Sequence, residues 1–113
     1  MGQYYKVVNL DKRQYLHAHQ FGEGLKLLEF GCSAGGTMTA LALLLASGNG
    51  RGGGDHPSKN PLIGSWAGDR IVIAGDYGDV GLYTDDPDIN LYTAASRDFE
   101  DISARVKSLV DEA

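Results

Sequence analysis

Cysteine and basic clusters are scarce in this 113-residue chain, and each scarcity excludes a class of protein. The one cysteine, Cys32, has no partner for an internal disulfide, and a zinc site built on cysteine pairs is excluded with it. No basic cluster is longer than Lys12-Arg13, and the formal net charge is −5. Binding to a nucleic-acid polymer requires a concentrated positive surface, so we expect no such partner.

Long apolar runs are missing as well. The most apolar stretch covers only residues 37–46, whereas a membrane-spanning helix needs about 20 residues. The start, Met-Gly-Gln-Tyr-Tyr, lacks the features of a signal peptide, so we expect a cytoplasmic location and no membrane partner. The length predicts a single domain over residues 1–113.

The most apolar stretch follows a glycine-rich loop at 31–36. Residues 25–30 (LKLLEF) lead directly into this loop, which favours a strand there. From 37 to 46 only Thr37 and Thr39 are polar, so a helix over these residues has no polar stripe. A helix that is apolar on all sides is a buried one, and the pattern therefore predicts a buried central helix over about 37–46.

The remaining segments predict β-structure and one further helix. Aromatic and β-branched runs predict strands, two of which flank a short charged turn as a hairpin; these strands cover 4–9, 14–17, 69–77, 82–83 and 90–93. Apolar residues at helical spacing predict an amphipathic C-terminal helix over about 98–111, with acidic residues in its first turn. The expected fold class is α+β, with a mostly antiparallel sheet.

The loop 48–61 is rich in glycine and favours contact with a ligand. Glycine lets the backbone approach a ligand closely, and a guanidinium can hold a phosphate through two parallel hydrogen bonds. Arg51 stands among glycines in this loop, and His56 follows it. A plain flexible surface loop is the alternative interpretation.

Aromatic side chains downstream could complete such a site. Trp66 or Tyr77 could stack on a ring, and Arg70 lies close to Trp66 in the sequence. Packing in the core is the alternative for Trp66. We therefore predict a ligand-binding site from the following residues: Arg51, Gly52, Gly53, His56, Trp66, Arg70 and Tyr77.

Two other motifs carry weaker indications. Residues 31–35 match G-x-S-x-G, but two glycines separate Ser33 from the helix and the loop lacks the lysine of a P-loop. The backbone N–H groups of this loop remain a candidate anion site. His17 and His19 would share one face of a strand and are weak metal candidates, with solvated histidines as the alternative.

Two segments, MGQYYKVVNLDKRQYL and GSWAGDRIVIAGDY, carry a family likeness. They resemble small uncharacterised proteins of bacteria and their phages. The likeness extends over much of the chain, but it implies no catalytic residue, cofactor or ligand. It implies a biological context in which short acidic proteins act by binding a host protein or by sequestering a small signalling molecule.

These observations lead to one functional hypothesis and two alternatives. The first is a small-ligand binding module, without a cofactor, for a phosphate-bearing nucleotide-like molecule, in the manner of a phage-type protein that sequesters a host immune signal. The second is an acidic interaction module that binds a host protein through some of its six tyrosines and has no pocket. The third is a metal-dependent hydrolase that uses His17 and His19. A homo-oligomer is left open as the assembly state.

Overall fold

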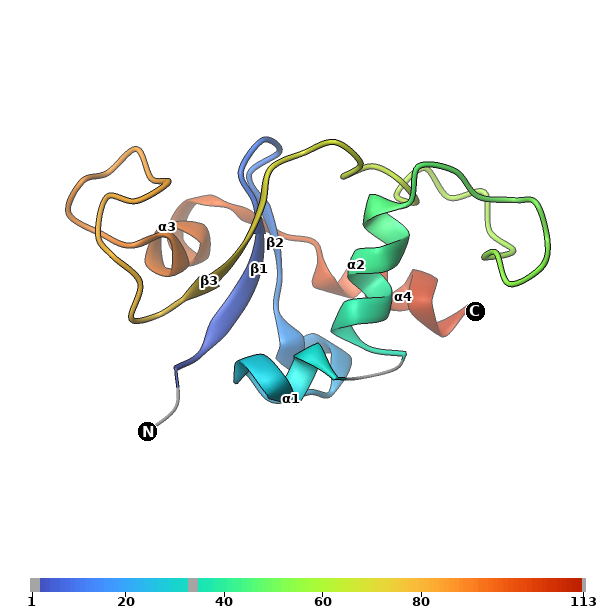
Figure 1. Cartoon of the computed structure of the whole chain (residues 1–113), viewed down its shortest axis with the longest axis horizontal. Helices are drawn as coiled ribbons and strands as arrows, with labels where there is room; N and C mark the ends of the chain where they lie inside the picture. Colours follow the sequence, from blue (N-terminus) through green and yellow to red (C-terminus); the bar gives the residue numbers. More distant parts are fainter. Residues whose placement is uncertain (1–2, 33–34, 113) are drawn as a thin grey trace.

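A computed structural model describes residues 3–32 and 35–112 and shows a four-stranded sheet in the order β3-β1-β2-β4 (Figure 1). The central pair is the predicted hairpin of β1 (Tyr5–Asn9) and β2 (Gln14–Leu16). β3 (Ile71–Gly75) pairs antiparallel with β1, and β4 (Glu100–Asp101) pairs parallel with β2. The predicted α+β class with a mostly antiparallel sheet is therefore confirmed.

Side chains that alternate along β1 pack against helices on both faces of the sheet. Val7 belongs to a core shared with α2 (Thr37–Leu45) and α4 (Ser103–Asp111). Val8 belongs to a second, smaller core beneath α3 (Leu91–Asp98). Figure 1 shows α3 on one side of the strands and α2 with α4 on the other. The sheet is thus the middle layer of the molecule.

The predicted central helix is present as α2, but only one of its faces is buried. Buried side chains recur at Thr37, Ala40, Leu41 and Leu44, whereas Leu45 is 37% exposed. The expectation of burial on all sides was wrong. The buried side of α2 packs on the core that it shares with β1 and α4, and among the described residues no second sheet covers its other side.

The strand predicted over residues 25–30 is instead the short helix α1 (Leu27–Gly31), which follows the 3-10 helix Ala18–Phe21. Leucine, lysine and glutamate are good helix formers, and the segment contains no β-branched residue. The Glu29 carboxylate accepts a hydrogen bond of 3.0 Å from the backbone N–H of Lys26 and so caps the first turn. Leu28 is 76% exposed, so the helix is held on one side only.

The strand predicted over 90–93 is also a helix, because Asn90 caps it. The Asn90 Oδ1 accepts a hydrogen bond of 3.0 Å from the backbone N–H of Thr93, and α3 begins at Leu91. Residues 82 and 83 lie in a turn rather than in a strand, and Tyr83 has a φ of 63°. Both corrections concern short runs in which local capping and turn geometry outweigh β-propensity.

The C-terminal helix begins later than predicted. Asp98 is the last residue of α3, and Glu100 with Asp101 forms β4, so α4 starts at Ser103. Asp101 still stabilises the start of that helix, because its Oδ1 accepts a hydrogen bond of 2.9 Å from the backbone N–H of Ser103. Val106, Leu109 and Val110 form its buried face, as the helical spacing predicted.

The connection from α2 to β3 is compact at Gly64. Its backbone N–H donates to the carbonyl of Leu43 at 2.9 Å, and its φ is 79°. A Cβ atom at this position would lie 2.6 Å from the carbonyl oxygen of Ala46, so only glycine fits.

Among the described residues, no helix is long and apolar enough to cross a membrane.

Candidate functional site

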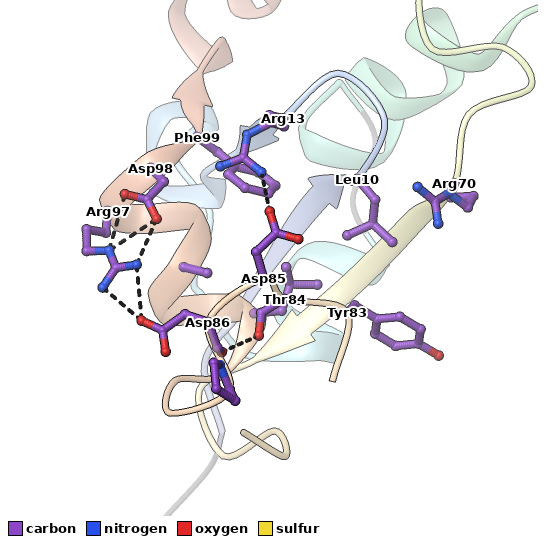
Figure 2. A pocket seen from close by; sticks show the side chains of 13 residues that line it. Leu10, Arg13, Arg70, Tyr83, Thr84, Asp85, Asp86, Arg97, Asp98 and Phe99 are labelled. Atoms are coloured by element: carbon purple, nitrogen blue, oxygen red, sulfur yellow. Dashed lines mark hydrogen bonds and ion pairs between the residues drawn. The ribbon is translucent and has the colours of Figure 1, made fainter. Parts of the chain in front are cut away.

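A cleft of about 640 Å³ lies where the loop between β3 and α3 packs against the hairpin turn (Figure 2). Its lining includes three cationic side chains from three different elements. Arg13 belongs to the hairpin turn, Arg70 precedes β3, and Arg97 lies on α3. Figure 2 shows Arg13 and Arg97 on the side of α3, and Arg70 with Tyr83 on the side of β3.

Arg13 is held by an aromatic ring and by a loose ion pair. Its guanidinium carbon lies 4.5 Å from the centroid of the Phe99 ring, which is a cation–π contact. One nitrogen lies 3.4 Å from Asp85, whose side chain is 97% exposed. Such an exposed, long ion pair stabilises by at most about 1 kcal/mol. Arg13 therefore carries a positive charge that is pre-positioned but weakly neutralised.

Arg70 is firmly oriented by Asp11. Its Nε and one terminal nitrogen donate to Asp11 Oδ1 at 2.9 and 2.8 Å, and its backbone N–H donates to Oδ2 at 2.7 Å. These hydrogen bonds from Arg70 hold the pKa of Asp11 below its usual value and raise the pKa of Arg70. The Arg70 side chain is still 73% exposed, so its direction is fixed while its outer face is open.

Arg97 is fixed mainly by its sequence neighbour. Its Nε and a terminal nitrogen donate to the carboxylate of Asp98, the shortest bond being 2.9 Å. Asp86 from the opposite loop lies farther away, at 3.5 Å. Hydrogen bonds from Arg97 lower the pKa of Asp98, and those to Asp98 raise the pKa of Arg97. Of the three arginines, Arg13 has the longest pairing distance to a carboxylate at its closest contact.

Backbone conformation singles out the same cleft. Within the described residues, the non-glycine residues with positive φ are Arg13, at 56°, and Tyr83, at 63°, and both line it. A non-glycine residue in this region costs on the order of 1–3 kcal/mol, and such residues cluster at functional sites. The strain places one charged and one aromatic side chain at the cleft.

The cleft combines both signs of charge with an exposed ring. Each of its three guanidinium groups can bind an anionic group, and the Asp85 and Asp86 carboxylates can accept hydrogen bonds from amino or hydroxyl groups. The Tyr83 side chain is 59% exposed and offers a face for stacking. This arrangement suits a polar ligand with a negative end and a planar end.

The glycine loop lies at the far end of the molecule from this cleft. In Figure 1 the loop between α2 and β3 extends to one end of the long axis, and α3 with its preceding loop lies at the other. Three of the residues predicted to bind a ligand, Arg51, Gly52 and Gly53, are exposed in the glycine loop. The structure therefore does not bring them together with Arg70.

His56 has a packing role in that loop. Its side chain is buried, its Nδ1 accepts from the Ser58 N–H at 3.0 Å, and its Nε2 lies 2.6 Å from the carbonyl oxygen of Leu109. Asn49 completes the link by accepting from the His56 N–H at 2.8 Å. Both ring nitrogens are engaged, so His56 ties the loop to α4.

The two aromatic residues predicted to stack on a ligand, Trp66 and Tyr77, lie in different environments. Trp66 is fully buried and donates its indole N–H to Gln14 Oε1 at 2.8 Å, so its ring serves the core. Tyr77 is 67% exposed just beyond β3. Arg70 is the one member of the predicted ligand site that lines the cleft.

The histidine motif forms no metal cluster among the described residues, and the glycine-loop motif lies partly outside them. The rings of His17 and His19 meet edge to face with centroids 5.2 Å apart. Within residues 3–32 and 35–112, no three His, Cys, Asp or Glu side chains are grouped so that they could hold a metal ion. The serine of the G-x-S-x-G match, Ser33, lies outside the described residues, as does Ala34 of the candidate anion loop.

Sequence reasoning missed Arg13, Tyr83 and Arg97. Arg13 reads as part of a polar hairpin turn, and Tyr83 stands in an acidic loop without a motif. No local signal connects these positions, because they line one cleft only after the loop has packed against α3 and the hairpin turn. Comparison with family models, with curated proteins and with solved structures finds no match.

Proposed function

We propose that this protein is a small-ligand binding module for a phosphate-bearing, nucleotide-like molecule, and that the ligand occupies the cleft beside α3. The observation that carries the proposal is that Arg13, Arg70 and Arg97 all line one cavity together with Tyr83, which is 59% exposed. Guanidinium groups recognise phosphate oxygens through paired hydrogen bonds. The volume of about 640 Å³ is in the range of small-molecule sites.

The individual residues have distinct roles in this proposal. Arg13 exchanges its loose contact with Asp85 for a phosphate group, since an exposed pair at 3.4 Å is easily replaced. Tyr83 stacks on the planar part of the ligand, and Arg70 closes the rim on the same side. With the likeness to phage-type proteins, sequestration of a host signalling nucleotide is the biological role we propose.

Calorimetric titration with phosphate-bearing nucleotides, cyclic and ADP-ribose types included, tests this function. We expect binding of one compound, and we expect Arg13→Gln to weaken it by roughly tenfold or more, because a charge-assisted hydrogen bond contributes about 1.5–3 kcal/mol. Arg51→Gln is the matched control, since Arg51 is exposed in the glycine loop. Absence of heat with every compound, or a loss confined to Arg51→Gln, would contradict the proposal.

A second candidate function is recognition of a host protein by the loop between β3 and α3. Three of its apolar or aromatic side chains are at least half exposed in addition to Tyr83: Tyr77, Val80 and Leu82. Tyrosine is a favoured contact residue at interfaces. Two results together would support this function instead. No nucleotide binds in the screen, and this loop cross-links to a host protein in the unsubstituted protein but not in Leu82→Ser.

A further inference from the structure

The two edges of the sheet are built very differently. One edge is β4, which has only two residues, both acidic and both exposed. The other edge is β3, which has five residues, IVIAG, with no charge and no proline. Proteins protect exposed edges by keeping them short, charged or covered. β4 has this protection and β3 lacks it.

The backbone groups that β3 offers at its open edge follow from its pairing with β1. The Leu10 N–H donates to the Arg70 carbonyl at 3.0 Å, and the Asp76 N–H donates to the Tyr4 carbonyl at 2.8 Å. At both ends of the strand, the backbone N–H and C=O groups of even-numbered residues thus point toward β1. Because hydrogen-bonded positions alternate along a strand, Ile71, Ile73 and Gly75 direct their N–H and C=O groups away from the sheet.

Apolar side chains accompany this open edge. Ile73 is 39% exposed, and Ile71 and Val72 are each only partly buried. Within the part of the chain that the structure describes, the Gly75 carbonyl accepts a hydrogen bond of 3.0 Å from the Gly78 N–H, and no loop segment forms a backbone hydrogen bond with Ile71 or Ile73 at this edge. The central residue, Ile73, therefore combines an open backbone edge with an exposed apolar side chain.

We propose that β3 is a dimerisation edge, at which a second copy of this chain adds its own β3 in antiparallel orientation. The two-fold axis passes beside Ile73, so that Ile73 pairs with Ile73 of the second copy and Ile71 pairs with Gly75. The two four-stranded sheets then form one continuous sheet of eight strands. This assembly goes beyond the ligand-binding function and does not depend on it.

Charge complementarity selects both the second copy as the occupant and the register. With the axis at Ile73, Arg70 of each copy lies opposite Asp76 of the other, and alternation places both side chains on the same face of the sheet. A shift to the next hydrogen-bonded register places Arg70 opposite Ala74 or Gly78 and loses the charge pair. The strand is thus complementary to itself, with a positive residue before it and a negative residue after it.

Sedimentation velocity over a concentration series tests the dimer. Five paired residues per copy bury a small area, so we expect a reversible dimer whose average mass rises with concentration from 12.1 kDa toward twice that value. Ile73→Lys places two like charges side by side at the axis and should weaken the dimer roughly tenfold or more. Leu45→Lys is the matched control, because Leu45 is 37% exposed on α2 and lies away from the edge.

A charge exchange tests the register independently of Ile73. Arg70→Asp alone and Asp76→Arg alone should each weaken the dimer, and the double variant should restore it. A protein that keeps the monomer mass at every concentration overturns the proposal. So does a dimer that Ile73→Lys and Leu45→Lys affect equally. Failure of nucleotide binding leaves these masses unchanged, so the two proposals fail separately.

Discussion

Replacing His56 with alanine should destabilise the protein without touching the cleft. The His56 ring is buried, and it joins the Ser58 N–H and the Leu109 carbonyl through hydrogen bonds of 3.0 and 2.6 Å. Since Ser58 donates to Nδ1, the proton of the neutral ring resides on Nε2 and is donated to Leu109. Each bond contributes about 1 kcal/mol, and the packed ring adds about as much again, so we expect a loss of about 2–3 kcal/mol.

Urea unfolding at neutral pH measures this loss as a lower midpoint at unchanged slope. In a thermal scan the same loss should lower the Tm by about 10 °C for a domain of this size. His19→Ala is the matched control, because His19 is exposed and its replacement should change the free energy of unfolding by no more than about 0.5 kcal/mol. Equal effects of the two substitutions would refute the role of His56 as the tie between the loop and α4.

Three further predictions concern single side chains. Burial lowers the pKa of Lys6, so the unfolded chain keeps this proton to a higher pH than the folded protein does. The Lys6 contribution should therefore make the free energy of unfolding rise as the pH increases toward 10.5, and urea unfolding at several pH values should show that this rise is missing in Lys6→Met. Asn90→Ala should lower the free energy of unfolding by about 1–2 kcal/mol, also measured in urea, because Asn90 caps α3 and donates to the Asp76 carbonyl at 2.8 Å. Hydrogen bonds from Arg70 hold the pKa of Asp11 below 3.8, so the Asp11 carboxylate stabilises the fold fully above that pH and loses this effect as the pH falls further. An acid titration followed by circular dichroism should therefore show a shallower loss of folded protein in Asp11→Asn than in the unsubstituted protein.

The long, strongly patterned segments of the fold could be predicted from the sequence, whereas the short ones depended on local contacts. The hairpin and the strand at 71–75 are rich in β-branched and aromatic residues, and the buried face of α4 follows helical spacing. The segment at 90–93 also contains two strand-favouring residues, Tyr92 and Thr93, but the Asn90 side chain caps a helix there. A run of four residues carries too little pattern to outweigh one capping hydrogen bond.

The candidate site was harder to predict than the fold, because its residues share no segment. Its three arginines are far apart in the sequence. Arg13 lies in the hairpin turn, Arg70 directly precedes β3, and Arg97 lies on α3. The glycine loop has a conspicuous composition, yet its glycines serve a connection held together by His56 and Asn49. Composition indicates where a backbone can bend, and only tertiary packing decides where charged side chains converge.

Arg70 belongs both to the cleft and to the open edge of β3, so ligand binding and dimerisation should affect each other through this residue. Its guanidinium is oriented by Asp11 toward the rim of the cleft, and its backbone lies at the end of the edge strand. In the proposed dimer, Asp76 of the second copy approaches the same guanidinium from the open side. A carboxylate there competes with a ligand phosphate for Arg70 but leaves Arg13 unaffected. If both proposals hold, ligand affinity should therefore fall modestly as the protein is concentrated into its dimer, and Asp76→Asn should remove that dependence.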